Sequence, residues 1–179
     1  MDFYSNKELK RIGFQKIGEN VQINRTVKFY NFHGTIGSNC RIDNFSILIG
    51  RVLISNNIHI SAFNLISATL KNKIKIDNFS GTAPKCYLST SGENYFSDDT
   101  SNPTMSKKLR NNTNTGDIII GKKVVIGTGS IIVPGKKNRN IIIGDNVSIG
   151  SKSFINNSIK SNCMVYNPDN YKNKIIKKR

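Results

Sequence analysis

Residues 36–71 read IGSNCRIDNFSILIGRVLISNNIHISAFNLISATLK, and every sixth position of this stretch, counted from Ile36, is Ile or Leu. A period of six does not match the 3.6-residue repeat of an α-helix. It is a multiple of the two-residue alternation of a strand, so the repeated side chain returns to the same side of an extended backbone. The stretch therefore predicts short strands joined by corners, wound into a solenoid.

The same repeat extends towards both ends of the chain. Sixteen of its eighteen blocks begin with Ile or Leu, and the starts are Ile17, Ile23, Phe29, Ile36, Ile42, Leu48, Ile54, Ile60, Ile66, Ile76, Thr82, Leu88, Ile120, Ile126, Ile132, Ile143, Ile149 and Ile155. Extra residues fall at Thr35, 72–75, 94–119 and 138–142, always after a multiple of three blocks. A coil with three six-residue sides predicts this, because an insertion can bulge from a corner without breaking the stack. We expect a mainly β fold: a triangular, single-stranded parallel β-solenoid of about five coils.

The segments outside the repeat are short. Residues 1–16 contain a helical pattern in which Leu9 and Ile12 share a face, and we expect this segment to cap the first coil. Residues 17–166 form the solenoid, from which the polar segment 92–115 is extruded as a long loop. Residues 167–179 make a basic tail that we expect to contain a short helix with Ile175 and Ile176 docked.

Composition narrows the function classes. The chain has 27 Lys and Arg against 11 Asp and Glu, a net charge of +16, which favours a polyanionic partner such as a phosphorylated small molecule or nucleic acid. It has no run of 18 apolar residues, so we expect no membrane insertion. The three cysteines, Cys40, Cys86 and Cys163, are far apart and without a CxxC pair, which indicates free thiols and a cytoplasmic protein.

Several ordered motifs resemble the hexapeptide-repeat acyltransferases, whose solenoid is a left-handed β-helix, and most closely the sugar O- and N-acetyltransferases of cell-surface polysaccharide synthesis. FYSNKELKRIGF (3–14) is similar to their N-terminal cap, and IGSNCRIDNF (36–45) with ISNNIHISAF (54–63) to their central coils. YFSDDTSNPT (95–104) resembles their acidic loop, and IGTGSIIVPG (126–135) a late coil. The resemblance implies acetyl-CoA as co-substrate, no metal, and a homotrimer with active sites between subunits.

His59 is the sixth residue of its block and should point outward from the solenoid. From its position alone, His59 could be a solvated surface residue or a general base. Imidazole is suited to act as a base because its pKa lies near neutral pH. The resemblance places the catalytic histidine in this HIS-A-F setting. His33 is expected at an inward, structural position, and two histidines cannot supply the three-histidine zinc site of the carbonic anhydrases built on this solenoid.

The remaining candidates divide between the two substrates. Residues expected to bind the sugar acceptor are Asp98, Asp99, Asn102 and Asn64, and Asp98 or Asp99 could instead orient His59. The resemblance lays the glycine-rich coil along the pantetheine arm of coenzyme A, with backbone N–H groups donating to it. Ammonium groups near the end of the chain suit the phosphates of the coenzyme. The cofactor residues are Gly127, Gly129, Ser130, Lys136, Lys152, Lys172 and Lys174.

The sequence thus predicts an acetyl-CoA-dependent sugar acetyltransferase, acting on the amino group of a nucleotide-linked deoxy-amino-hexose. O-acetylation of a sugar hydroxyl in a glycan is the alternative. A non-catalytic solenoid that binds a polyanion is a more distant one, because its basic residues would have to follow one face with aromatic residues between them, and here they concentrate late in the chain. We therefore expect no nucleic-acid partner.

Overall fold

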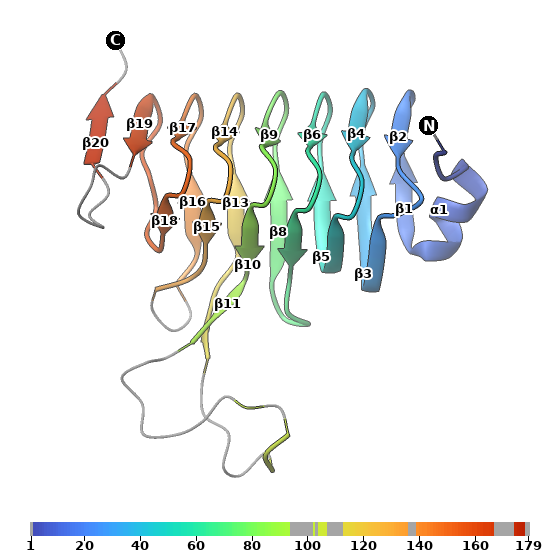
Figure 1. Cartoon of the computed structure of the whole chain (residues 1–179), viewed down its shortest axis with the longest axis horizontal. Coiled ribbons are helices and arrows are strands. Elements are labelled where there is room, and N and C mark those ends of the chain that lie inside the picture. Colours follow the sequence, from blue (N-terminus) through green and yellow to red (C-terminus); the bar gives the residue numbers. More distant parts are fainter. Residues whose placement is uncertain are drawn as a thin grey trace.

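The computed structural model describes residues 2–93, 102, 104–106, 113–135 and 139–166, and the backbone of 174–177. The chain is a parallel β-solenoid, with the helix α1 (Asn6–Ile12) at one end and β20 (Lys174–Lys177) at the other (Figure 1). Each turn contributes one short strand to each of three faces, which we name A, B and C in the order in which the chain meets them between residues 51 and 67.

Strand pairing defines the three faces. Face A contains β1 (Phe14–Ile17), the second halves of β3 (Lys28–Ile36) and β5 (Ile47–Ile54), then β8 (Lys73–Ile76), β13 (Ile118–Ile120) and β16 (Ile141–Ile143). Face B contains β2 (Val21–Ile23), β4 (Cys40–Ile42), β6 (His59–Ile60), β9 (Gly81–Thr82), β14 (Val125–Ile126), β17 (Ser148–Ile149), β19 (Cys163–Tyr166) and β20. Face C contains the first halves of β3 and β5, then β7 (Leu65–Ser67), β10 (Tyr87–Ser89), β15 (Ile131–Ile132) and β18 (Phe154–Ile155).

The hexapeptide repeat sets the interior. Of the eighteen block starts, all but Ile17 and Phe29 are buried, and they stack in register from turn to turn. Face A has six strand segments among the described residues, so the solenoid has about six turns and the expected five was too few. Eighteen blocks at three per turn require this number.

Left-handed backbone values shape the corners. Between faces A and B this conformation is held by Asn20, Asn39, Asn57, Asn146 and Asn162 among others, with φ between 52° and 58° for these five. Asparagine tolerates this region better than most other non-glycine residues, which explains its presence at these corners. Corner asparagines also bond from turn to turn, as in the 3.1 Å contact of the Asn20 and Asn39 amides.

The N-terminal helix closes the first turn. Ser5 and Glu8 form a capping box, Leu9 is fully buried, and Gly13 ends the helix at φ 128°. Arg25, from the solenoid, forms an ion pair with Glu8 at 2.8 Å and so ties the helix to the first coil. This agrees with the expected role of the segment as a cap.

The other end differs from expectation. Lys174–Lys177 is a strand, β20, that pairs antiparallel with β19, and the predicted short helix is wrong. The last parallel strand of a solenoid leaves its backbone groups unpaired, and an added strand satisfies them. The extruded segment begins and ends in a short antiparallel pair, β11 (Ser91–Gly92) with β12 (Asn114–Thr115), which leads away from the solenoid (Figure 1).

Candidate functional site

His59 lies on β6, near the middle of face B, and points outward as expected. Its side chain is 54% exposed. Its neighbours in register are Arg41 on β4 and Gly81 on β9. Because Gly81 has no side chain, the imidazole is unobstructed on the side that faces the later coils.

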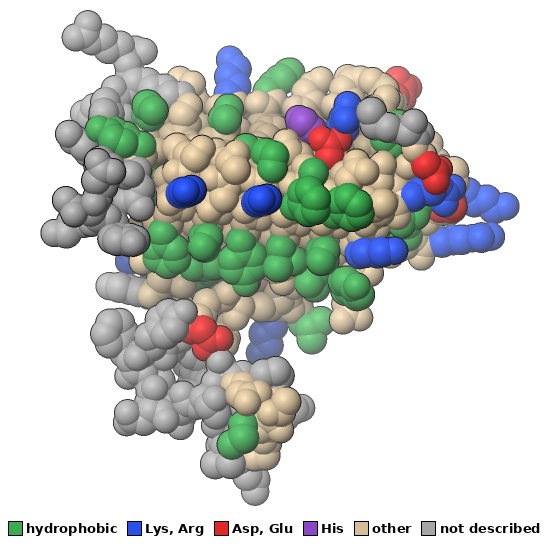
Figure 2. Space-filling view, viewed as in Figure 1, with side chains coloured by type: hydrophobic (Ala, Val, Ile, Leu, Met, Phe, Trp, Pro, Cys, Tyr) green, Lys and Arg blue, Asp and Glu red, His purple; other side chains and the backbone are tan. Residues whose placement is uncertain are grey.

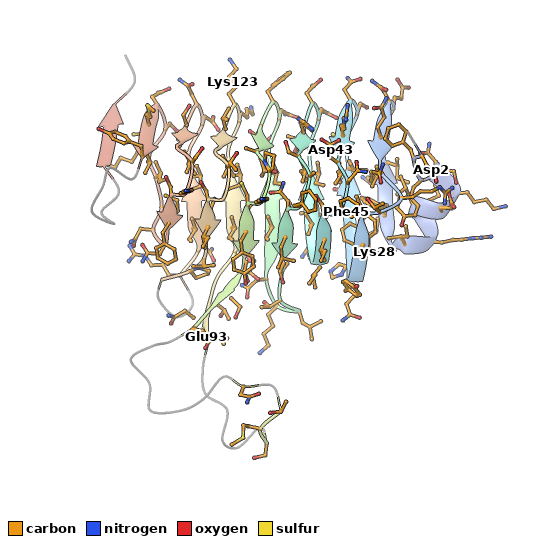
Figure 3. All side chains as sticks on the ribbon, viewed as in Figure 1. Asp2, Lys28, Asp43, Phe45, Glu93 and Lys123 are labelled. Atoms are coloured by element: carbon orange, nitrogen blue, oxygen red, sulfur yellow. The ribbon has the colours of Figure 1, made fainter. Side chains whose placement is uncertain are left out.

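Asp43 holds this histidine. One carboxylate oxygen lies 2.7 Å from His59 Nε2, and the other accepts a hydrogen bond of 2.6 Å from Arg41 Nε. Partial burial opposes ionisation of Asp43, but the hydrogen bonds from His59 and Arg41 outweigh it, so the pKa of this carboxyl is lowered. Figure 2 shows a histidine, an acidic and a basic side chain together on the surface, where Figure 3 labels Asp43.

This arrangement assigns a direction to the imidazole. An ionised Asp43 accepts a hydrogen bond from Nε2–H, and the lone pair of the neutral ring is then on Nδ1. A ring held in one tautomer beside a carboxylate can take a proton at its free nitrogen and is stabilised when it becomes charged. Asp43 therefore occupies the orienting position that the sequence suggested for Asp98 or Asp99, which lie outside the described residues.

Two other acceptor candidates lie elsewhere. Asn64 is only 1% exposed, and its side-chain N–H groups donate to the carbonyls of Ser61 and Ala83 inside the corner between faces B and C. It braces this corner from the inside, and its predicted contact with substrate stays a prediction. Asn102 lies in the extruded segment, where its side-chain oxygen accepts hydrogen bonds from the N–H and hydroxyl of Thr104.

The glycine-rich turn keeps its place on face B but not its predicted contacts. The N–H groups of Gly127, Gly129 and Ser130 already donate to the carbonyls of Ile149, Pro84 and Gly127, and the Ser130 side chain is buried. In this structure the three N–H groups are therefore engaged within the solenoid, and the contact of these residues with pantetheine stays a prediction. Thr128 is exposed on the same turn, and its hydroxyl has no hydrogen-bond partner among the described residues.

Of the four lysines expected at the coenzyme phosphates, Lys152 is exposed at the corner between faces B and C. Lys136 and Lys172 lie outside the described residues, and Lys174 is described by its backbone alone. His33 is half-buried on face A, between the buried Phe32 and Gly34, so it points outward and the inward position expected for it is wrong.

Three further features are metal-binding groups, membrane-spanning helices and the state of the cysteines. The described part of the chain has no group of three or more His, Cys, Asp or Glu residues placed to hold a metal ion. Within the same ranges no helix is long and apolar enough to cross a membrane. All three cysteines are free and buried.

A cavity that sequence reasoning missed lies at the corner between faces C and A, beside the base of the extruded segment. Its volume is about 580 Å³, and it is lined by Asn31, Ile49, Gly50, Ala68, Thr69, Leu70, Lys71, Asn72, Thr113 and Thr115. The insertion 72–75, after the block that starts at Ile66, could have predicted this cavity, because extra residues at a corner can form one side of a cavity.

Comparison with known proteins gives the family. No protein-family profile matches the chain. It is 31% identical over 159 residues to a dTDP-4-amino-4,6-dideoxy-D-glucose acyltransferase from Escherichia coli, covering 87% of this chain and 79% of that protein.

Solved structures agree. The N-acyltransferase AntD from Bacillus cereus, in complex with dTDP and 3-hydroxybutyryl-CoA, superposes with a TM-score of 0.87 at 31% identity, over 100% of this chain and 91% of AntD. A variant of AntD in complex with dTDP-4-amino-4,6-dideoxyglucose and coenzyme A gives 0.85 at 31% identity over the same shares. A maltose O-acetyltransferase from Clostridium difficile 630, 22% identical over 96% of this chain and 73% of its own, shares the fold with a TM-score of 0.53. The chain therefore belongs to the hexapeptide-repeat sugar acyltransferases.

Proposed function

We propose that this enzyme transfers an acyl group, most simply acetyl, from coenzyme A to the amino group of a nucleotide-linked deoxy-amino-hexose. The observation that carries the proposal is the match of the whole chain to AntD complexes that hold a dTDP-linked 4-amino sugar and coenzyme A. Three free, buried cysteines agree with action in the reducing cytoplasm, and a product of this kind suits surface polysaccharide synthesis.

His59 is the proposed general base. The amino nitrogen of the acceptor attacks the thioester carbonyl, so that a C–N bond forms and the C–S bond breaks. The proton lost from nitrogen goes to His59 Nδ1, the nitrogen opposite the Asp43 contact, and coenzyme A leaves as the thiolate. An amine with a pKa near 8 is partly neutral at working pH, so it needs this base less than a hydroxyl does.

The proposed assembly is a homotrimer. On face C, the outward residues of five successive strands form an apolar column, which consists of Ile47, Leu65, Tyr87, Ile131 and Phe154. Phe154 is 47% and Ile131 37% exposed, and beside the column the rings of Phe45 and Phe63 stack with centroids 5.1 Å apart. The hydrophobic band is visible along the solenoid in Figure 2. An apolar face of this length supports burial against further copies of the chain.

Release of coenzyme A thiol tests the function. Acetyl-CoA is offered with matched pairs of nucleotide-linked hexoses that differ only in an amino or hydroxyl group at one carbon. Release with the amino sugars alone supports N-acyl transfer. Release with the hydroxyl sugars alone would overturn it in favour of O-acetylation, and no release with either set, while calorimetry detects coenzyme A binding, would point to a glycan acceptor.

The role of His59 has its own test. His59→Asn should lower turnover at least about tenfold with an amine acceptor, because a positioned base contributes ~10²–10⁴-fold when it is fully needed. Binding of coenzyme A should stay unchanged. Gln22→Asn, an exposed substitution in the same column of face B, is the matched control. Unaltered turnover in His59→Asn would refute the base assignment while leaving acyl transfer intact.

A further inference from the structure

The N-terminal helix presents a cluster of cations to the solvent. Lys7, Lys10 and Arg11 of α1 are all exposed. Leu9 is fully buried against the first coil, and Ile12 is half-buried beside it. With about 3.6 residues per turn, the three cations occupy an arc of about 100° on the side of the helix opposite Leu9. Figure 2 shows Lys and Arg side chains projecting from this end of the molecule.

The nearby acidic residues do not neutralise these cations. Asp2 and Glu8 both form ion pairs with Arg25, each at 2.8 Å. The three cations of α1 form no ion pair with any residue in the part of the chain that the structure describes. Within the same ranges this also holds for Lys16 and Lys28, which are exposed on β1 and β3, the strands that contact α1 (Figure 3 labels Lys28). Residues 2–31 hold six Lys and Arg against three Asp and Glu, a net charge of +3.

The stability of the helix does not account for this arrangement. Lys10 and Arg11 lie in the last turn, where the helix dipole favours cations. Lys7 lies in the first turn, where the dipole disfavours a cation. Lys7 is also three and four residues from the other two, so that like charges adjoin on one face and destabilise the helix slightly. An anionic partner would compensate for this cost.

The composition of this end favours an anionic lipid surface over other anionic or self-complementary partners. α1 has no aromatic side chain, so it lacks the stacking groups that surfaces binding single-stranded nucleic acid place beside their cations. A second copy of the chain is disfavoured, because residues 172–179 hold five Lys and Arg and no Asp or Glu and would be repelled. Clusters of Lys and Arg on one face of an amphipathic helix are typical of proteins that bind acidic phospholipid head groups.

We propose that the α1 end of the solenoid docks reversibly on an anionic lipid bilayer, with Lys7, Lys10 and Arg11 against the head groups and Lys16 and Lys28 at the margin. The apolar side of α1 stays packed on the first coil, so the contact is peripheral and electrostatic. Threefold symmetry places three such ends on the same side of the proposed trimer, so that the contacts of single chains reinforce one another. The inference does not depend on the proposed reaction.

Sedimentation of the full-length protein with lipid vesicles tests the docking. Vesicles of phosphatidylglycerol mixed with phosphatidylcholine should bind the wild type, and vesicles of phosphatidylcholine alone should not. Raising the salt to about 0.5 M NaCl should release the protein. The triple variant Lys7→Gln, Lys10→Gln, Arg11→Gln should bind at least about tenfold more weakly, because each cation near an acidic leaflet contributes about fivefold.

The triple variant Lys122→Gln, Lys123→Gln, Lys160→Gln is the matched control, because it removes the same charge from exposed positions on later coils. It should bind the mixed vesicles as the wild type does. Equal losses in the two triple variants would show attraction by net charge alone and overturn the assignment, as would a wild type that does not bind these vesicles. A wild type that binds duplex DNA through α1 but no vesicle would assign the surface to nucleic acid and refute the lipid proposal.

The orientation of the docked protein can be measured because the chain has no tryptophan. Asn6→Trp places one at the exposed start of α1, and Asn157→Trp places one between β18 and β19, near the other end of the solenoid. Energy transfer to a dansyl-labelled head group should be strong from residue 6 and weak from residue 157. Equal transfer from the two positions, or stronger transfer from residue 157, would refute docking through α1. If the wild type releases no coenzyme A with any sugar but binds vesicles through α1, the proposed function fails and the docking assignment stands.

Discussion

Thr82 is the one hydroxyl among the eighteen block starts, and it offers a sharp test of the solenoid interior. Its side chain points inward from β9, in register between Ile60 on β6 and Ile126 on β14. It is 3% exposed, and its hydroxyl oxygen is buried with no hydrogen-bond partner among the residues that the structure describes. We predict that Thr82→Val stabilises the protein.

The magnitude follows from the missing partner. Burying a hydroxyl without a hydrogen bond costs about 1–3 kcal/mol, and valine places a methyl group of nearly the same shape in its position. A gain of about 1.5 kcal/mol in the free energy of unfolding is expected. For a chain of this length it corresponds to a rise in Tm of about 3–6 °C.

Thermal and urea unfolding, followed by circular dichroism at one fixed protein concentration, would measure this gain, since assembly makes Tm depend on concentration. Thr82→Ser keeps the hydroxyl and removes the methyl group, so it should lower Tm. If Thr82→Val is no more stable than the wild type, the hydroxyl has a partner such as a buried water, and the reasoning that the interior is dry at this position fails.

Two further predictions concern the N-terminal cap and the corners. The Ser5 hydroxyl and N–H, and then Arg25, lower the pKa of Glu8 from 4.5 to about 2, so Glu8 stabilises the fold above pH 4.5 and this contribution is lost as the pH falls towards 2. The Tm of Glu8→Gln, measured from pH 7 to 2.5, should therefore fall less steeply than that of the wild type, and parallel curves would contradict the assignment. Gly13→Ala should lower Tm by several degrees, because φ is 128° and the added Cβ would lie 2.2 Å from a backbone oxygen of the adjoining coil. Gly129→Asn, at φ 69° with the added Cβ 3.8 Å from the Lys152 side chain, should cost little, and equal losses in these two variants would refute the argument.

The hexapeptide pattern predicted the fold because it records which side chains face the interior. It also contained information that the site prediction left unused. Asn64 is the fifth residue of the block that starts at Ile60, an inward position, so its burial could have been anticipated. Asp43 directly follows Ile42, the block start that stacks on Ile60, and so lies one coil from His59. The positions of Asp43 and His59 within their hexapeptides place both side chains on the outside of face B.

Other features depended on contacts that no local pattern encodes. KNKIIKKR has no period that separates a helix from a strand, and β20 forms because β19 offers it an open edge. The cavity at the corner between faces C and A combines Asn31, Gly50 and Thr113, which are separated by up to 82 residues in the sequence. In the glycine-rich turn, the N–H groups that looked available to a ligand donate to backbone carbonyls of the same or a neighbouring turn.

The order of coils along face B suggests how the two substrates meet. Successive strands of a sheet lie about 4.8 Å apart, so Gly127, at the end of β14, is about 10 Å from the level of His59 on β6, and Lys152, one coil further, about 14 Å. An extended pantetheine arm of coenzyme A is long enough to cover this distance. With its phosphates towards the C-terminal quarter of the chain, where lysines are most frequent in the sequence, its thioester would reach the turn that carries His59. In the proposed reaction, the acceptor amine would therefore meet the thioester at the level of β6, beside His59.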